Sequence, residues 1–325
     1  MWSRPDLVDR LVCPACRQPI VWRDSTGTCT RCRRVYPVED GIPILLLDRA
    51  AAVHDEIEHR QAGHKRAQAS YFDREEAAGF ERERPRGTPR LHQWLLRRKF
   101  LLGTASIRSF LPGATVFVAC GGSGMDGEFL AEAGARVITS DISLGAARRA
   151  SARAGKYRLA VASIVADIEA LPLRDRSVDL AYVHDGLHHL INPEAGLVEM
   201  VRAAGKAVSI TEPAHARVTS LAIRIGIARE FEEAGNRVER LRPEALVSWL
   251  ERAGLQVTKA QRYAIFYRHR PGRVAGLLSL PGLAALAQLA LLGAILSSGR
   301  FGNKLTVQAT RDSRAAQLDW RIKEA

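Results

Sequence analysis

The start of the sequence lacks any stretch that resembles a secretory signal. The first ten residues, MWSRPDLVDR, are polar and lead directly into a cysteine motif, whereas a signal peptide carries an apolar central segment. We therefore expect a cytoplasmic protein. Global disorder is excluded too, because hydrophobic residues make up 46% of the 325 positions. A chain of this length is enough for one sizeable domain with an appendage, or for two domains.

A concentrated charge is also missing. The 48 Lys and Arg residues outnumber the 35 Asp and Glu residues and leave a net charge of +13. Such an excess suggests a nucleic-acid or anionic-membrane partner. However, residues 1–110 hold 20 basic and 14 acidic residues, so the excess is spread along the chain. A diffuse excess favours a solvated basic surface over a dedicated site for a polyanion.

Cysteine is scarce, and its few positions are patterned. Four of the five cysteines form two C-x-x-C pairs, Cys13 with Cys16 and Cys29 with Cys32. Two such knuckles predict a tetrahedral zinc site, since each pair directs two sulfurs at one ion. Two disulfides are the alternative, which the absence of an export signal disfavours. Four thiolates leave no open coordination position, so we expect the zinc to be structural.

The residues after the second knuckle resemble a known zinc ribbon. The stretch RVYPVEDGIPILLL at 34–47 contains Tyr36-Pro37 and Asp40-Gly41-Ile42-Pro43. With the cysteines, residues 11–47 resemble the family typified by the activator subunit of tRNA and protein methyltransferases. The resemblance implies a binding and scaffold module without chemistry of its own. We expect a zinc ribbon over 1–48, followed by a helical linker and N-terminal helices over 49–110.

From residue 111 to 325 the sequence predicts a third unit. Strand-like runs alternate with helix-like runs, beginning with TVFVA at 115–119 and a helix through MDGEFLAEAG. This βαβ alternation predicts an α/β fold, a Rossmann-like doubly wound parallel sheet that binds its ligand at the carboxyl ends of the strands. KLTVQATR at 304–311 is expected to be the last strand.

The stretch VFVACGGSGMDG at 116–127 marks the nucleotide loop. Gly122, Gly124 and Gly127 spell G-x-G-x-x-G directly after a predicted strand, which fits either a dinucleotide or S-adenosylmethionine (SAM). Asp141 ends the next strand, where a carboxylate can accept hydrogen bonds from ribose hydroxyls. Both cofactors contain a ribose, so Asp141 does not discriminate between them.

The stretch that discriminates between the two cofactors is ADIEALPLRDRSVDLAYVHDGLHHL at 166–190. It resembles the class I SAM-dependent methyltransferases, in particular the ubiquinone-biosynthesis group. The matching elements are Asp167, Leu171-Pro172-Leu173, Val178-Asp179, Leu187-His188-His189-Leu190, Pro193, Glu199-Met200 and Thr211-Glu212-Pro213. Because dehydrogenases do not carry this series, we expect SAM as the cofactor.

The resemblance implies a cofactor site. Asp167 is expected to accept a hydrogen bond from the adenine amino group, and Ile142 and Ile168 to sandwich the ring. The loop glycines Gly121, Gly122 and Gly124 are expected to let the backbone approach the methionyl part. Asp185 and Gly186 are expected beside the reactive methyl group.

The chain departs twice from the family pattern in this loop. Val118 stands where the family has an acidic residue, and Cys120 stands where it has its first glycine. We interpret Cys120 as a small residue packed under the loop rather than as a reactive thiol. The lost acid keeps open the hypothesis of a catalytically degenerate, SAM-binding scaffold.

Methyl transfer to a hydroxyl or amide also needs a base. The candidates at the carboxyl ends of the fourth and fifth strands are His188, His184 and Glu212, with Asp185 and His215 nearby. Histidine suits the role because its ordinary pKa lies near neutral pH. His188 belongs to a family motif, so it is also interpreted as a helix cap.

Two insertions are candidates for acceptor selection and docking. Residues 214–240 are expected to form a cap over the acceptor. Residues 271–300 lack any charge between Arg273 and Arg300. Their length would suffice for a membrane span, but the flanking strands should share one sheet. We expect a buried helical hairpin, or one that contacts a membrane surface through 274–298, with the flanking arginines on anionic lipid headgroups.

Three functions follow as hypotheses. The first is a methyltransferase acting on a small-molecule, glycan or lipid-linked acceptor, most simply at oxygen, in the cytoplasm or at the inner membrane face. The second is an rRNA or tRNA methyltransferase, since zinc knuckles do bind RNA. The third is the degenerate scaffold, whose ribbon recruits a partner.

Overall fold

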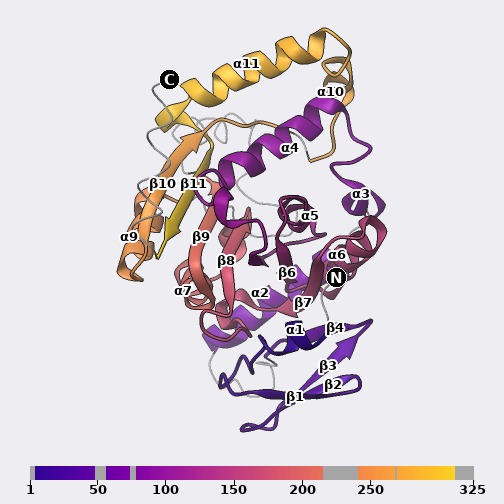
Figure 1. The fold of residues 1–325 in the computed structure, drawn as a ribbon, viewed down its shortest axis with the longest axis vertical. Helices are drawn as coiled ribbons and strands as arrows, with labels where there is room; N and C mark the ends of the chain where they lie inside the picture. The colour runs from indigo at the N-terminus through magenta and orange to yellow at the C-terminus, as the bar shows by residue number, and fades with distance from the viewer. Residues whose placement is uncertain (1–3, 48–55, 74–77, 215–240, 268, 312–325) are drawn as a thin grey trace.

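The computed structural model describes residues 4–47, 56–73, 78–214, 241–267 and 269–311. The predicted cap falls almost entirely outside these residues. In the described part, one 11-stranded sheet runs through the molecule in the order β1-β2-β3-β4-β7-β6-β5-β8-β9-β11-β10. The small N-terminal unit lies at one end of this sheet, and helices cover both faces of the rest (Figure 1).

The N-terminal unit is an antiparallel ribbon. It begins with helix α1 (Arg4–Val8) and continues with strands β1 (Ile20–Arg23), β2 (Thr26–Cys29), β3 (Val35–Glu39) and β4 (Ile42–Leu45). Consecutive strands pair antiparallel, and β4 then pairs parallel with β7, with Ile44 opposite Val165. The ribbon therefore extends the main sheet at its edge, so that β7 is an inner strand.

The centre of the sheet is parallel, as the alternation predicts. It consists of β5 (Thr115–Ala119), β6 (Arg136–Asp141), β7 (Val161–Ala166), β8 (Val178–His184) and β9 (Ala204–Pro213). The chain starts in the middle at β5, moves out to β7, and returns to β8 on the other side of β5. That reversal creates the crevice in which such sheets bind ligands.

The far edge of the sheet is antiparallel, which makes the whole sheet mixed. Strand β11 (Lys304–Thr310) pairs antiparallel with both β9 and β10 (Gln256–Tyr263). KLTVQATR is thus the last strand, as expected, and it lies between two strands that precede it in the sequence. Because β10 and β11 pair antiparallel, the chain leaves β10 and enters β11 at the same end of the sheet.

Side-chain alternation along the strands produces two apolar cores. On one face, Val116 and Val118 pack with α4 (Arg90–Gly103) and α5 (Met125–Glu132), next to α6 (Leu144–Tyr157). On the other face, Phe117 and Ala119 belong to a core with α7 (Pro193–Ala203) and α9 (Pro243–Arg252). Two helices of the linker, α2 (Glu56–Asp73) and α3 (Ala78–Glu83), pack against α6.

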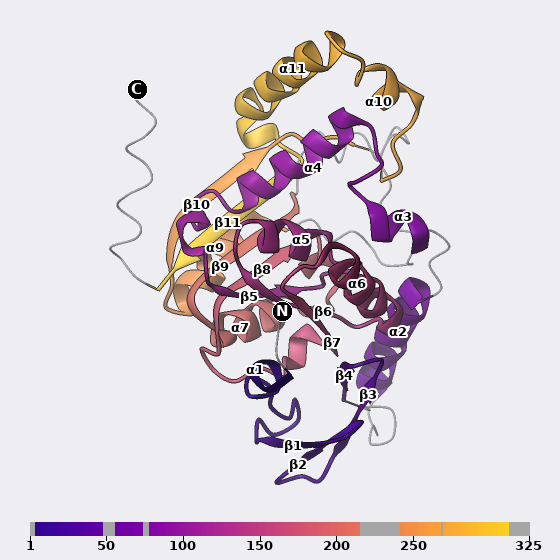
Figure 2. The ribbon, with the colours of Figure 1, turned by 45° about the vertical axis from the view of Figure 1, so that its right-hand side comes forward.

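The apolar insertion forms α10 (Arg273–Leu277) and α11 (Leu283–Ser297), and the expectation that it is buried is wrong. Within α11 only Ile295 is buried, whereas Leu286, Leu289 and Leu296 are each about two-thirds exposed, at 66%, 65% and 66%. Both views place the two helices at the end of the molecule opposite the ribbon (Figures 1 and 2). Among the described helices, none combines the length and apolarity needed to cross a bilayer.

Candidate active site and metal centre

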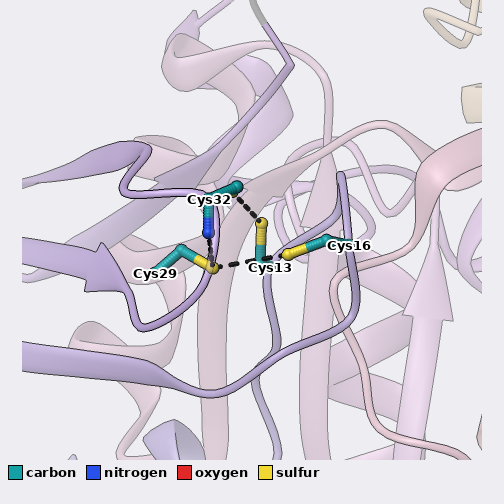
Figure 3. A group of neighbouring side chains, drawn as sticks. All are labelled: Cys13, Cys16, Cys29 and Cys32. Carbon is teal, nitrogen blue, oxygen red and sulfur yellow. Dashed lines mark hydrogen bonds between the residues drawn. The ribbon is translucent and has the colours of Figure 1, made fainter.

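The four paired cysteines converge. Cys13 Sγ lies 3.5 Å from Cys32 Sγ, Cys16 Sγ lies 3.4 Å from Cys29 Sγ, and the four sulfurs all lie within 4.8 Å of one another. Their side chains point to one centre (Figure 3). Tetrahedral thiolates at about 2.3 Å from zinc are roughly 3.8 Å apart, which these spacings match. The sulfurs are too far apart for bonds, so the disulfide alternative is wrong.

A second layer supports the metal centre. The Tyr36 hydroxyl lies 3.0 Å from Cys13 Sγ, and both residues are buried. A hydroxyl donated to a thiolate fixes the direction of the sulfur lone pairs and disperses its charge. The Tyr-Pro step that carried the resemblance therefore contributes directly to the cysteine cluster.

A cavity of about 330 Å³ lies at the carboxyl ends of β5, β6, β7 and β8. It lies where the topology predicts the ligand. Most of the predicted cofactor residues line it, namely Cys120, Gly121, Gly122, Asp141, Ile142, Asp167, Ile168 and Asp185. Gly124 and Gly186 do not. Gly124 precedes α5 in a left-handed conformation against Ala150, and Gly186 packs beneath Cys120.

The glycine loop is held against the second strand of the parallel sheet. A Cβ on Gly121 would lie 2.0 Å from Thr139 Oγ1, so only glycine fits there. The Gly122 amide donates to Asp141 Oδ2 at 3.0 Å, and the Ser143 amide donates to Asp141 Oδ1 at 3.0 Å. Burial raises the Asp141 pKa against these bonds. The carboxylate is thus fixed at the cavity wall, where it can accept hydrogen bonds from a ribose.

The linker supplies a residue that the sequence did not reveal. Lys65 of α2 donates to Asp167 Oδ2 at 2.7 Å and also bonds Glu169. The second Asp167 oxygen accepts from the Glu169 amide at 3.0 Å. Lys65 therefore orients Asp167, which is predicted to meet adenine. Phe72, near the end of α2, also lines the cavity.

His188 and Glu212 form a closed pair away from the cavity. Glu212 is fully buried, and its Oε1 accepts from the amides of Gly186 at 2.9 Å and Leu187 at 2.7 Å. Its Oε2 lies 2.7 Å from His188 Nδ1. Neither side chain lines the cavity. The pair holds the turn η3 (Leu187–His189) in place behind the site.

His184 has the geometry of a base. It is the last residue of β8, it lines the cavity, and its Nδ1 lies 2.9 Å from Asp126 Oδ1. Burial works to raise the Asp126 pKa, but His184 outweighs it and holds the pKa below its usual value. An ionised Asp126 accepts only, so Nδ1 donates to it, and Nε2 is the ring nitrogen that can meet an acceptor. His184 Nε2 is buried and makes no hydrogen bond.

Two lysines meet at Asp185. Lys304 of β11 donates to Asp185 Oδ1 at 2.6 Å, and Lys99 of α4 bonds Asp185 Oδ2 and donates to the Tyr267 hydroxyl at 3.0 Å. Burial works to raise the Asp185 pKa, but both ammonium groups hold it well below its usual value. Burial works to lower the Lys99 pKa, and Asp185 and Tyr267 raise it instead. With the ionised Asp126 on the other side of His184, the two ammonium groups are balanced by two carboxylates.

The two departures in the glycine loop have structural explanations. Val118 is 1% exposed within an apolar core, away from polar partners. Cys120 has φ +50°, the left-handed conformation that glycine adopts most easily, and its side chain packs on Gly186. Burial and the nearby Asp141 raise the Cys120 pKa well above its usual value. Cys120 is therefore a protonated packing residue.

Restoring the missing acid at Val118 should destabilise the protein. We expect Val118→Asp to lower the free energy of unfolding by about 3 kcal/mol, because it buries a carboxylate without a partner. Urea denaturation measures the change, with Val118→Ala as the matched control for lost volume. Unchanged stability together with tighter SAM binding would show instead that the carboxylate reaches the cavity.

Comparison with known families agrees with this geometry. Residues 116–207 match the family described as "Methyltransferase domain", and residues 4–41 match the family described as "Trm112p-like protein". The chain contains a methyltransferase domain and an N-terminal Trm112p-like domain. The methyltransferase match spans β5 to β9, and the Trm112p-like match contains all four clustered cysteines.

Individual relatives cover one part of the chain or the other. A UPF0434 protein of Alcanivorax borkumensis is 41% identical over 54 residues, which cover 16% of this chain and 87% of that protein. A demethylmenaquinone methyltransferase of Corynebacterium urealyticum is 38% identical over 103 residues, 31% of this chain and 42% of that enzyme. The chain therefore spans less than half the length of this second relative.

A solved structure shares the fold. The magnesium protoporphyrin IX methyltransferase of Synechocystis PCC 6803, with SAH bound, superposes with a TM-score of 0.52 at 18% identity. The alignment covers 76% of this chain and 100% of that one. At this identity the likeness establishes the architecture of the methyltransferase domain and leaves its acceptor to be inferred from the site.

Proposed function

We propose that this methyltransferase transfers the methyl group of SAM to a hydroxyl group of a small-molecule, glycan or lipid-linked acceptor, with His184 as the general base. The observation that carries the proposal is the buried, unpartnered Nε2 of His184 at the cavity wall, whose opposite nitrogen is fixed by Asp126. A hydroxyl must lose its proton during methylation, and a neutral imidazole at this position can accept it.

The cavity residues fit the cofactor. SAM supplies an electrophilic methyl group on a sulfonium. The Asp141 carboxylate is proposed to bind the ribose hydroxyls, and Asp167 to accept from the adenine amino group between Ile142 and Ile168. A Cβ on Gly122 would meet no protein atom within 4 Å, so the open side of this residue is proposed to let the backbone approach the methionyl part. These contacts fix the direction from which an acceptor must approach.

The acceptor side of the cavity suits a developing oxyanion. The Lys99 and Lys304 ammonium groups outnumber the single Asp185 carboxylate that they bind. His184 Nε2 lies 3.7 Å from Asp185 Oδ2, so that carboxylate also stabilises the imidazolium formed when His184 takes the proton. Fixed charges in a largely buried site act more strongly than they would in water.

We also propose how the chain is divided into units. We assign residues 1–48 to the zinc ribbon, 49–110 to the linker and helices that close the cofactor side, and 111–325 to the catalytic unit. Arg17 of the ribbon bonds Glu199 of α7 at 2.7 Å, and the Val12 amide donates to the Pro172 carbonyl at 3.0 Å. We also propose a cytoplasmic location, since cysteines that bind a metal rather than pair in disulfides are typical of a reducing compartment.

Incubation of a cell extract with methyl-labelled SAM tests the proposed function. We expect label in the lipid, glycan or small-molecule fraction, in a product that carries an O-methyl group. Label in RNA would favour the RNA methyltransferase alternative. The binding of the protein to RNA should then weaken steeply with salt. SAM binding by calorimetry without any labelled product would support the scaffold hypothesis.

A further inference from the structure

We propose that the outer face of α10 and α11 docks on an anionic lipid surface. We call this surface the apolar face. Its members are exposed by 42% to 69% and comprise Val274, Leu277, Leu280, Leu283, Leu286, Leu289 and Leu296. Single exposed leucines are ordinary on protein surfaces, whereas seven large exposed apolar side chains within 23 consecutive residues are a density typical of an interaction site.

The internal packing of the molecule uses only one side of α11. Ala287, Leu291 and Ile295 face a core with Leu91 and Leu95 of α4. A helix that packs on one side and meets water on the other carries charged residues on its outer side. Helix α11 carries none, and Gln288 and its terminal Ser297 are its only polar residues. The residues on the outer side of α11 therefore suit contact with an apolar environment better than contact with water.

The charge around the apolar face selects the occupant. Residues 252–311 contain nine Lys and Arg residues and no Asp or Glu. Over the whole chain acidic residues offset most of the positive charge, but no acidic residue does so in the segment that carries the apolar face. Arg270 precedes α10 and Arg273 is its first residue; both are exposed, and the Arg270 guanidinium lies 5.7 Å from the centre of the Phe80 ring. Arginines beside an apolar face complement anionic headgroups.

The topology allows the apolar face to meet a bilayer while the sheet stays in water. Tyr263 at the end of β10 pairs with Lys304 at the start of β11, so the insertion leaves and re-enters the sheet at one end. Both ends of the insertion therefore lie on the same side of any membrane it touches. In Figures 1 and 2, α11 is the outermost element at that end of the molecule, with α4 beneath it.

A second hollow adjoins the cofactor cavity beside the strand ends at which the apolar insertion leaves and re-enters the sheet. It is lined by Ile265, Phe266, Tyr267, His269, Asn303 and Lys304. Two of these residues, Tyr267 and His269, also line the cofactor cavity, and Phe266 is 69% exposed. A lipid-linked acceptor could enter from the bilayer here and reach Lys304 and His184. This last step rests on the proposed function, whereas the docking itself does not.

A second copy of the chain is a weaker occupant. Face-to-face dimerisation would bring the same acid-free segment of both copies together, and like charges at close range oppose association. An anionic bilayer supplies apolar contact and the opposite charge at once. Because only the bilayer supplies negative charge, vesicles with and without anionic lipid distinguish it from a second copy.

Flotation of the full-length protein with vesicles tests the docking, without SAM or acceptor. Vesicles of phosphatidylcholine with phosphatidylglycerol are compared with vesicles of phosphatidylcholine alone. We expect binding to the mixed vesicles that weakens at high salt and is much weaker on the neutral ones. Leu286→Glu/Leu289→Glu should reduce partitioning on the order of a hundredfold. Val198→Glu, at a 49% exposed site on α7, is the matched control and should bind normally.

The outcomes divide cleanly. Equal binding to both vesicle types, loss of binding in Val198→Glu, or no binding at all would overturn the proposal. A concentration-dependent dimer in sedimentation velocity that Leu286→Glu/Leu289→Glu abolishes, without vesicle binding, would assign the face to a second copy. Arg273→Gln should weaken binding to anionic vesicles only. Because no methyl transfer is measured, failure of the proposed catalytic function would leave these results unchanged.

Discussion

Replacement of His184 by glutamine is expected to lower kcat about 100- to 10,000-fold, the usual contribution of a general base. Glutamine keeps a similar volume and can still contact Asp126, but its amide cannot take a proton from a hydroxyl. Calorimetric titration should give an unchanged affinity for SAM, because His184 lies on the acceptor side of the cavity. Single-turnover transfer from labelled SAM to the acceptor found by fractionation measures the rate.

Two further variants locate the effect. His64→Gln, on α2 and outside the cavity lining, is the matched control and should retain full activity. Asp126→Asn should reduce the rate and move the acidic limb of the pH–rate profile to lower pH, because the Asp126 carboxylate stabilises the imidazolium form of His184. A His184→Gln enzyme with normal kcat would rule out His184 as the base and favour an acceptor that needs none.

Removal of zinc should unfold the ribbon. Structural zinc contributes about 10–16 kcal/mol in small peptides that fold around it. Here part of the ribbon core, including Leu11 and Tyr36, is shared with the main core, so the remainder of the protein should stay folded at a lower Tm. Cys29→Ser, or chelation, should abolish zinc binding and expose the amides of β1 to β4 to hydrogen exchange. Because β4 pairs with β7, exchange should also rise in β7.

Cys120→Ser is the matched control for this experiment, since Cys120 is the one described cysteine outside the cluster. It should keep one zinc per chain and native exchange in the ribbon. Unchanged exchange in β1 to β4 after complete zinc loss would mean that packing against the methyltransferase domain alone holds the ribbon.

The sequence determined the features that depend on local spacing. Two C-x-x-C knuckles can present four sulfurs to one ion with little help from the rest of the chain, and the fold brings them together as predicted. Alternating strands and helices fixed the parallel centre of the sheet and hence the edge at which the cavity opens. The motif around Asp167 and Leu171-Pro172-Leu173 assigned the family.

Only the tertiary structure decided which polar groups meet. Lys65, Lys99 and Lys304 reach their carboxylates across separations of 102, 86 and 119 residues, so local patterns carry no trace of them. His188 and His184 look equally suitable in the sequence. His188 is buried within η3 and its ring contacts Glu212, whereas His184 lies at the end of β8 and lines the cavity.

The apolar insertion shows the same division. Its composition predicts apolar surroundings, but composition cannot say whether protein or lipid provides them. The answer depends on how much apolar surface the neighbouring elements offer, and α4 covers only one side of α11. Local chemistry along the chain thus established the metal, the cofactor class and the architecture of the catalytic sheet. The proposed base, the charge cluster and the exposed apolar face depend on contacts between distant segments, which only the folded chain creates.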